Sequence, residues 1–62
     1  MPLIQVNMLE GRSQAAKAAF AESVTQAAVE NLGVKTEQVR VLIHEIAPES
    51  WFTAGQCKEA PK

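Results

Sequence analysis

The feature that most constrains the fold is a long stretch without proline or glycine between two short stretches of alternating residues. Ser13 is a favourable N-cap residue and Gly33 suits the position just past a helix end, so we expect a helix over about residues 13–32. Apolar and polar residues alternate over 3–9 and again over 39–46, as in strands with one covered face. The pattern predicts an α/β (α+β) fold built on one β-α-β unit. Its strands should be parallel, because strands joined through a crossover helix normally are.

The same periodicities assign faces to these elements. In the first strand Ile4, Val6 and Met8 share one face. In the second, one face is expected to carry Val39, Val41 and Ile43, and the other face Arg40, Leu42, His44 and Ile46. The helix residues expected to form one apolar stripe are Ala16, Ala19, Phe20, Ser23, Val24, Ala27 and Leu32.

The segment after the second strand carries a weaker pattern. Pro48 ends the strand, because proline cannot donate a hydrogen bond to a neighbouring strand. Residues 49–62 are expected to form a short C-terminal hairpin or an irregular tail. With 62 residues the chain has room for a single domain, over 1–62.

The chain has few of the side chains that build a core. Only 18 of its residues are large and apolar, while ten are alanine. Domains of this size usually need disulfides, a structural metal or oligomerisation. One cysteine cannot form an internal disulfide, and one cysteine with one histidine cannot complete a four-ligand zinc site. We therefore expect a homo-oligomer in which copies of the chain join their sheets.

Charge and composition argue against several kinds of partner. The net charge is −1, with seven Glu and no Asp against six Lys and Arg. Such a balance predicts no nucleic-acid binding, and no apolar run has the length of a membrane span. The N-terminus does not resemble a signal peptide, and a single cysteine fits a reducing compartment, so we expect a cytoplasmic protein. No phosphate-binding loop or metal cluster is apparent, and we expect neither a cofactor nor a metal.

Pro2 is the first candidate for chemistry. Removal of the initiator Met1 would turn its nitrogen into a secondary amine that can accept a proton. An apolar pocket and nearby cations both lower the pKa of such an amine, and a base with a pKa near the working pH is efficient. The alternative is that Pro2 merely begins a strand, where proline is tolerated.

The two arginines are the next candidates. Arg12 follows the first strand, and Arg40 lies within the second beside Leu42. The planar guanidinium suits bidentate binding of carboxylates. The alternative is a pair of ordinary salt bridges, to Glu10 or Glu45.

Three further residues have open interpretations. Trp51 could line a pocket or anchor the C-terminal segment on a neighbouring subunit. His44 faces the same way as Arg40 and is either a secondary polar group or a structural residue. Cys57 has no partner base nearby in the sequence and is interpreted as an ordinary thiol.

Several of these residues together resemble the 4-oxalocrotonate tautomerase family. The resemblance rests on the Met-Pro start, on Leu9-Glu10-Gly11-Arg12-Ser13 before a long helix, and on Val39-Arg40-Val41-Leu42-Ile43-His44-Glu45. An aromatic residue follows at Trp51. The match runs from Pro2 to about Gly55. Phe52 and Pro48 depart from the family pattern, which bears on the shape of the pocket.

The resemblance implies a role for each matching residue. Pro2 would be the general base, and Arg12 would bind a substrate carboxylate and draw electron density towards it. Arg40, from a neighbouring subunit, would bind the other carboxylate and the enol or keto oxygen, and Trp51 would wall the pocket. It also implies an isomerase without a cofactor, acting on a small unsaturated 2-oxo or 2-hydroxy (di)carboxylic acid. Members of this length are generally homohexamers, built as trimers of dimers.

Two other functions fit the same scaffold. A hydratase or dehalogenase of an unsaturated acid would use the amine in its protonated form and would need another group to activate water. The chain has no Asp and no Glu obviously placed for that task. A non-catalytic oligomeric binding module is the other alternative, and retention of Met1 would favour it.

Overall fold

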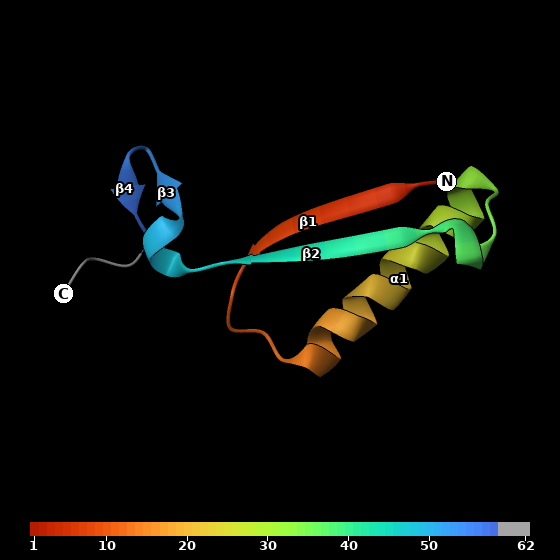
Figure 1. The fold of residues 1–62 in the computed structure, drawn as a ribbon, viewed down its shortest axis with the longest axis horizontal. Coiled ribbons are helices and arrows are strands. Elements are labelled where there is room, and N and C mark those ends of the chain that lie inside the picture. The colour runs from red at the N-terminus through yellow and green to blue at the C-terminus, as the bar shows by residue number, and fades with distance from the viewer. Residues whose placement is uncertain (59–62) are drawn as a thin grey trace.

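The structure, a computed structural model, describes residues 1–58 and contains the predicted β-α-β unit followed by a hairpin (Figure 1). Its elements in order are β1 (Leu3–Leu9), α1 (Gln14–Leu32), the 3-10 turn η1 (Thr36–Gln38), β2 (Arg40–Ile46), the 3-10 turn η2 (Pro48–Ser50), β3 (Phe52–Thr53) and β4 (Gln56–Cys57). Of the two predicted C-terminal alternatives, the short hairpin is confirmed. Residues 59–62, the end of the segment predicted as hairpin or tail, lie outside the described residues.

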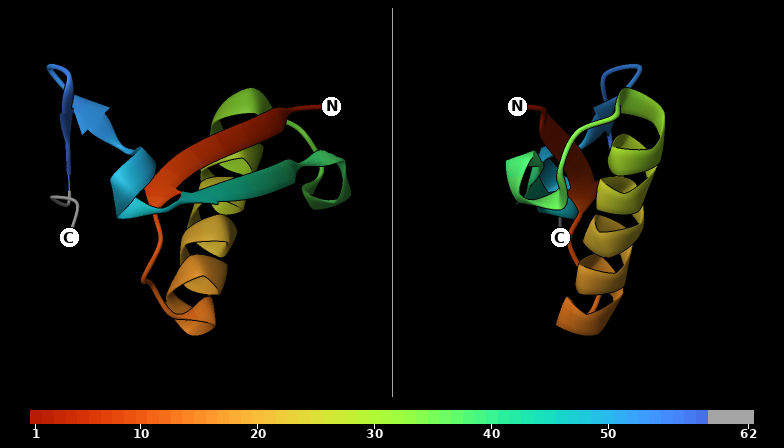
Figure 2. Two further views of the ribbon diagram at one scale, coloured as in Figure 1. Left: turned by 60° about the vertical axis from the view of Figure 1, so that its left-hand side comes forward. Right: turned by 90° about the vertical axis from the view of Figure 1, so that its right-hand side faces the viewer.

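The strands β1 and β2 are parallel, as predicted. Their register runs from Leu3 opposite Arg40 to Leu9 opposite Ile46. The helix α1 lies on one side of this two-stranded layer (Figure 2). Residues that begin both strands therefore share one end of the sheet, and residues that follow both strands share the other.

The predicted caps fix the ends of α1. Ser13 Oγ accepts a hydrogen bond from the Ala16 backbone N–H at 3.1 Å, as an N-cap side chain does. Gly33 is left-handed, with φ of 69°, and its N–H donates to Val29 O at 3.2 Å. Both signals were present in the sequence, so the helix bounds differ from the prediction by a single residue.

The face that α1 turns towards the sheet differs from the predicted stripe. The helix residues that are buried or half-buried are Lys17, Ala21, Val24, Thr25, Ala28 and Val29. Only Val24 belongs to the predicted set, whereas Phe20 and Leu32 stay 41% and 63% exposed. Alanines occur on nearly every side of this helix, so apolar spacing alone does not single out one face.

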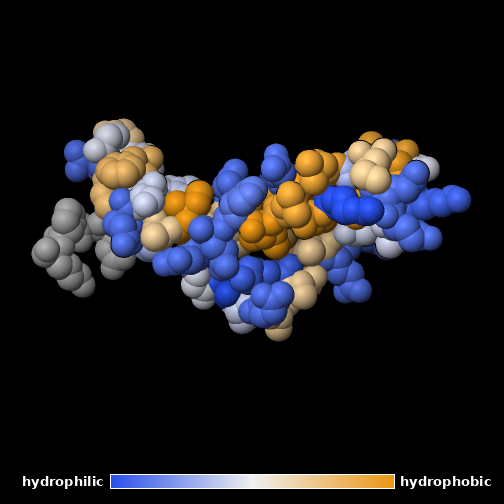
Figure 3. Space-filling model, viewed as in Figure 1, coloured by the Kyte–Doolittle hydropathy of each residue, from blue (hydrophilic) through white to orange (hydrophobic). Residues whose placement is uncertain are grey.

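The far face of the sheet is open to solvent. Leu3, Gln5 and Asn7 of β1 are exposed, and so are Leu42 and His44 of β2. Their neighbours along each strand are mostly half-buried beneath the helix. Apolar side chains are visible on the surface over the two strands (Figure 3). The predicted alternation is thus confirmed over residues 3–8 and 40–44. It fails at Ile46, which was predicted on the same face as Arg40 but is half-buried, and at the exposed Glu45. One side of the sheet has no cover within residues 1–58.

The chain is extended and leaves little of itself buried. Ala28, which is 6% exposed, is the one buried residue among those described. The radius of gyration is 14.9 Å, against about 10.5 Å for a compact chain of this length. The accessible surface is 4817 Å². A compact monomer of this mass would expose about 3900 Å². The excess of about 900 Å² is close to what one partner contributes to a standard protein interface.

The hairpin β3–β4 has a defined geometry. Phe52 pairs with Cys57 and Thr53 with Gln56, which leaves a two-residue turn. Ala54 and Gly55 in that turn have φ of 53° and 78°, the values of a type I′ turn. Glycine adopts such a positive φ easily at Gly55, whereas at Ala54 the Cβ atom makes the positive φ unfavourable.

One further property concerns membranes. Within residues 1–58, no helix has both the length and the apolar character that crossing a bilayer requires.

Candidate functional site

Pro2 and Arg40 lie at one end of the parallel sheet. The backbone N–H of Arg40 donates to Pro2 O at 3.0 Å, which extends the strand pairing by one residue. Pro2 is half-buried, and Met1 before it is 78% exposed. The Arg40 guanidinium turns back along its own chain, and Nη1 donates to Glu37 O at 2.6 Å and Val39 O at 3.4 Å. The proline end therefore holds one predicted base and one predicted carboxylate-binding cation.

Arg12 and Trp51 lie beyond the opposite end of the sheet. A hydrogen bond of 3.0 Å from Glu10 N–H to Ile46 O closes the strand pairing there. Arg12 follows in the loop that leads to the helix, and its side chain is exposed. Trp51 is half-buried at the end of η2, where its N–H donates to Pro48 O at 3.2 Å.

The length of β1 keeps these two groups apart within one chain. A strand of seven residues, as β1 is, places its ends about 20 Å apart. The structure thus brings Pro2 next to Arg40 and leaves Arg12 and Trp51 at the far end. The predicted site residues form two half-sites, and one copy of the chain cannot gather them around one small substrate.

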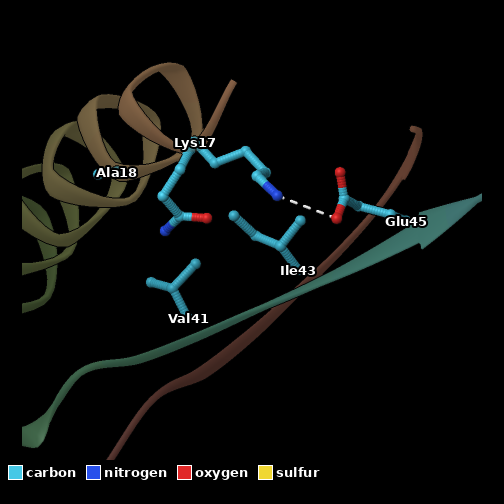
Figure 4. Close-up of a pocket in the computed structure, with 6 residues that line it drawn as sticks. Lys17, Ala18, Val41, Ile43 and Glu45 are labelled. Carbon is cyan, nitrogen blue, oxygen red and sulfur yellow. Dashed lines mark ion pairs between the residues drawn. The ribbon is translucent and has the colours of Figure 1, made fainter. Parts of the chain in front are cut away.

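A separate hollow, which the sequence did not predict, lies between α1 and β2. It has a volume of about 250 Å³ and contains none of the predicted site residues; it is lined by Gln14, Lys17, Ala18, Val41, Ile43 and Glu45. Lys17 Nζ and Glu45 Oε1 form an ion pair of 2.9 Å across it (Figure 4). The alternative interpretation of the arginines, a salt bridge to Glu45, is not found within residues 1–58: Lys17 lies on the sheet side of α1 and pairs with that carboxylate.

His44 and Cys57, the remaining candidates from the sequence, lie outside both half-sites. His44 is exposed on the open face of the sheet, where it pairs with Asn7 across the strands. Cys57 Sγ lies 3.6 Å from Pro48 O and is half-buried in the hairpin. No group of three potential metal ligands of the types His, Cys, Asp and Glu occurs in the part of the chain that the structure describes.

Comparison with known proteins gives a consistent family. The family model described as "Tautomerase enzyme" matches residues 2–60. The 2-hydroxymuconate tautomerase of Comamonas testosteroni is 49% identical over 55 residues, which cover 89% of this chain and 87% of the relative.

Solved structures agree with that result. The crystal structure of TomN, a 4-oxalocrotonate tautomerase homologue of the tomaymycin biosynthetic pathway, has a TM-score of 0.90 at 49% identity. The match covers 92% of this chain and 88% of TomN. A heterohexamer 4-oxalocrotonate tautomerase from Chloroflexus aurantiacus has a TM-score of 0.89 at 36% identity and 94% coverage of both chains.

The fold, the family model and these relatives define a small tautomerase. The chain belongs to the 4-oxalocrotonate tautomerase family. Membership supports an isomerase that catalyses tautomerisation, and the solved heterohexamer supports oligomeric assembly.

Proposed function

We propose that this chain catalyses keto–enol tautomerisation of a small unsaturated 2-oxo or 2-hydroxy (di)carboxylic acid, with the amine of Pro2 as general base. The observation that carries the proposal is the position of Pro2. It is half-buried just before β1, it accepts a hydrogen bond from the Arg40 N–H through its carbonyl, and it follows an exposed Met1. Removal of Met1 would leave a basic nitrogen at a point that the backbone hydrogen bond to Arg40 holds in place.

The proposed chemistry moves one proton within the substrate. The neutral amine takes a proton from a hydroxyl group or from a carbon next to the carbonyl, and a dienolate forms. The resulting ammonium returns the proton to another carbon, so the reaction needs no external acid, oxidant or reductant. Guanidinium groups placed where the oxygen becomes negative stabilise the transition state, and they also orient a dicarboxylate.

The two half-sites imply that this chemistry takes place between copies. Pro2 of one copy would meet Arg12 and Trp51 of another, because β1 holds these residues about 20 Å apart in a single chain. If a two-fold axis pairs the sheets of two copies in antiparallel fashion, the Pro2 end of one sheet lies beside the Arg12 end of the other. The Arg40 guanidinium bonds to Glu37 and Val39 and not to Pro2, which is compatible with the expectation that it serves a neighbouring copy's site.

The proposed partners follow from the same argument. The chain would work as a homo-oligomer, a homohexamer built as a trimer of dimers, on a carboxylate substrate. Its excess surface of about 900 Å² supports contact with at least one partner. A single cysteine in the sequence fits activity in the reducing cytoplasm.

The first test combines intact-mass spectrometry with the Pro2→Ala variant. The purified natural sequence should lack the mass of Met1. Pro2→Ala should ketonise 2-hydroxymuconate or phenylenolpyruvate about 10²–10⁴-fold more slowly, since positioned proton transfer contributes that order of rate. Its oligomeric state should match the wild type. Equal rates would contradict the role of Pro2, and a retained Met1 with no activity would favour the binding module. Turnover of a haloacrylate without tautomerase activity would favour the hydratase or dehalogenase.

A further inference from the structure

Two aromatic side chains at the start of the hairpin point in opposite directions. Trp51 immediately precedes β3, which begins at Phe52, and its backbone is extended, with φ of −106° and ψ of 110°. Consecutive residues of an extended backbone point to opposite faces. The pairing continues on both sides of this step, because Phe52 pairs with Cys57 and Lys58 N–H donates to Trp51 O at 2.8 Å. Trp51 is half-buried, whereas Phe52 is 62% exposed.

The hairpin also connects the positions of Phe52 and Trp51. The type I′ turn at Ala54 and Gly55 connects strands of two residues, and Cys57 holds β4 against Pro48 of η2. A surface that holds Phe52 therefore sets where Trp51 lies. Such short strands are marginal by themselves in water, so the hairpin needs packing from outside to keep one position.

The most suitable source of that packing is a second copy of the chain. The hairpin extends beyond the sheet, at the end away from the N-terminus (Figures 1 and 2). The chain exposes about 900 Å² more than a compact monomer, which matches the share of one partner in a standard interface. The hairpin also lies at the Arg12 end, and the proposed site at that end is incomplete until another copy supplies Pro2.

We infer that Phe52 is an interchain anchor: it packs against a second copy of this chain and thereby positions Trp51 at the site between the copies. Phe52 is a positioning residue, and it does not touch the substrate. The placement of Trp51 at a site rests on the proposed function, whereas the anchoring of the hairpin by Phe52 does not.

The single tryptophan of the sequence makes the test direct. Because Trp51 is the only tryptophan in the sequence, the emission reports only on the segment that leads into the hairpin. In Phe52→Ala the emission should shift to longer wavelength at protein concentrations where the wild type is assembled. The dissociation constant of the assembly should rise about tenfold, as truncation of a buried aromatic anchor typically does. KM should rise by a similar factor with a smaller change in kcat, because the chemistry at Pro2 is intact.

Two further variants separate anchoring from general damage. Phe52→Leu keeps an apolar side chain and should restore most of the emission, the assembly and KM. Gln56→Ala changes an exposed polar residue of the same hairpin and should behave as wild type.

The outcomes distinguish this inference from the proposed function. A raised KM without any change in assembly or emission would mean that Phe52 contacts the substrate, and it would overturn the anchor. Unchanged assembly, emission and KM would overturn it as well. A third outcome would refute the proposed function and support the anchor: the wild-type protein has no tautomerase activity, while Phe52→Ala loses assembly and shifts the emission of Trp51.

Discussion

The two ends of the parallel sheet differ in what holds their functional residues. At the start of the strands, Pro2 and Arg40 are joined directly by a backbone hydrogen bond of 3.0 Å. At the other end, Arg12 lies in an exposed loop and Trp51 in a segment that leads to the hairpin. The first end is fixed by the strand pairing itself, whereas the second depends on segments with few neighbours in their own chain.

This difference separates the chemistry from the recognition of the substrate. The proposed base belongs to the part of the chain with the most regular structure. The residues proposed to orient and enclose the substrate belong to a loop and to the approach to the hairpin. The position of the base is therefore fixed within one copy. Substrate selectivity depends on residues at the contact between copies, and it can change when that contact changes.

Mixing two inactive variants should produce the largest effect. Pro2→Ala and Arg12→Ala should each lose most activity when refolded alone. Refolded together in equal amounts, they should recover about a quarter of the wild-type rate, because that fraction of sites pairs an intact Pro2 with an intact Arg12 from another copy. Ketonisation rates measured after joint refolding test this. A mixture no more active than its components would show that the two ends are not combined between copies.

Arg40→Ala should have the next largest effect. A guanidinium that stabilises charge developing on the substrate oxygen contributes to kcat, so kcat should fall about 10²-fold. Arg40→Lys is the matched variant, which keeps the charge but loses the planar fork, and it should recover only part of the rate. Steady-state kinetics with a dicarboxylate substrate measure both. If Arg40→Ala kept the wild-type kcat, Arg40 would have no role in stabilising the transition state.

The ion pair between Lys17 and Glu45 should affect stability and not chemistry. The pair joins α1 to β2, and its side chains are 17% and 35% exposed. Partly screened pairs of this kind contribute about 0.5–1 kcal/mol. A double-mutant cycle of Lys17→Met and Glu45→Gln should show that coupling in the free energy of unfolding, measured at one fixed protomer concentration. Additive single effects would mean that the pair contributes nothing.

Ala54→Gly should give the smallest effect, and it should be stabilising. The left-handed φ of 53° costs alanine about 1 kcal/mol, and the extra flexibility of unfolded glycine offsets part of the gain. We expect a net gain of about 0.5 kcal/mol in urea denaturation. Ala47→Gly is the control, since Ala47 has φ of −65° and should lose stability when replaced. A loss in Ala54→Gly would contradict the turn geometry.

Much of the fold was predictable from local signals. Ser13, Gly33 and the two alternating stretches predicted the ends of α1 and the parallel strands, because caps and period-two alternation act over a few residues. The helix face was not predictable, since alanine gives almost no contrast between sides. The ion pair of Lys17 with Glu45 was missed for a related reason: the predicted stripe did not include Lys17, which lies on the sheet side of the helix.

The division of the site between two ends of the sheet could have been predicted from the sequence, but only by an argument from topology. Parallel strands bring their starting residues together, so Pro2 and Arg40 had to share one end, and Arg12 and Trp51 had to follow at the other. The contribution of a neighbouring copy to each half was implied only by the family resemblance, because residue patterns by themselves carry no information on symmetry between copies.

The open sheet has a consequence for how the protein is made. Within residues 1–58, β1 and β2 pair only with each other, so each keeps a free edge, and one face carries exposed Leu3 and Leu42. Free edges and uncovered apolar faces are sites of aggregation. A newly synthesised chain is therefore most vulnerable in the interval before it meets another copy.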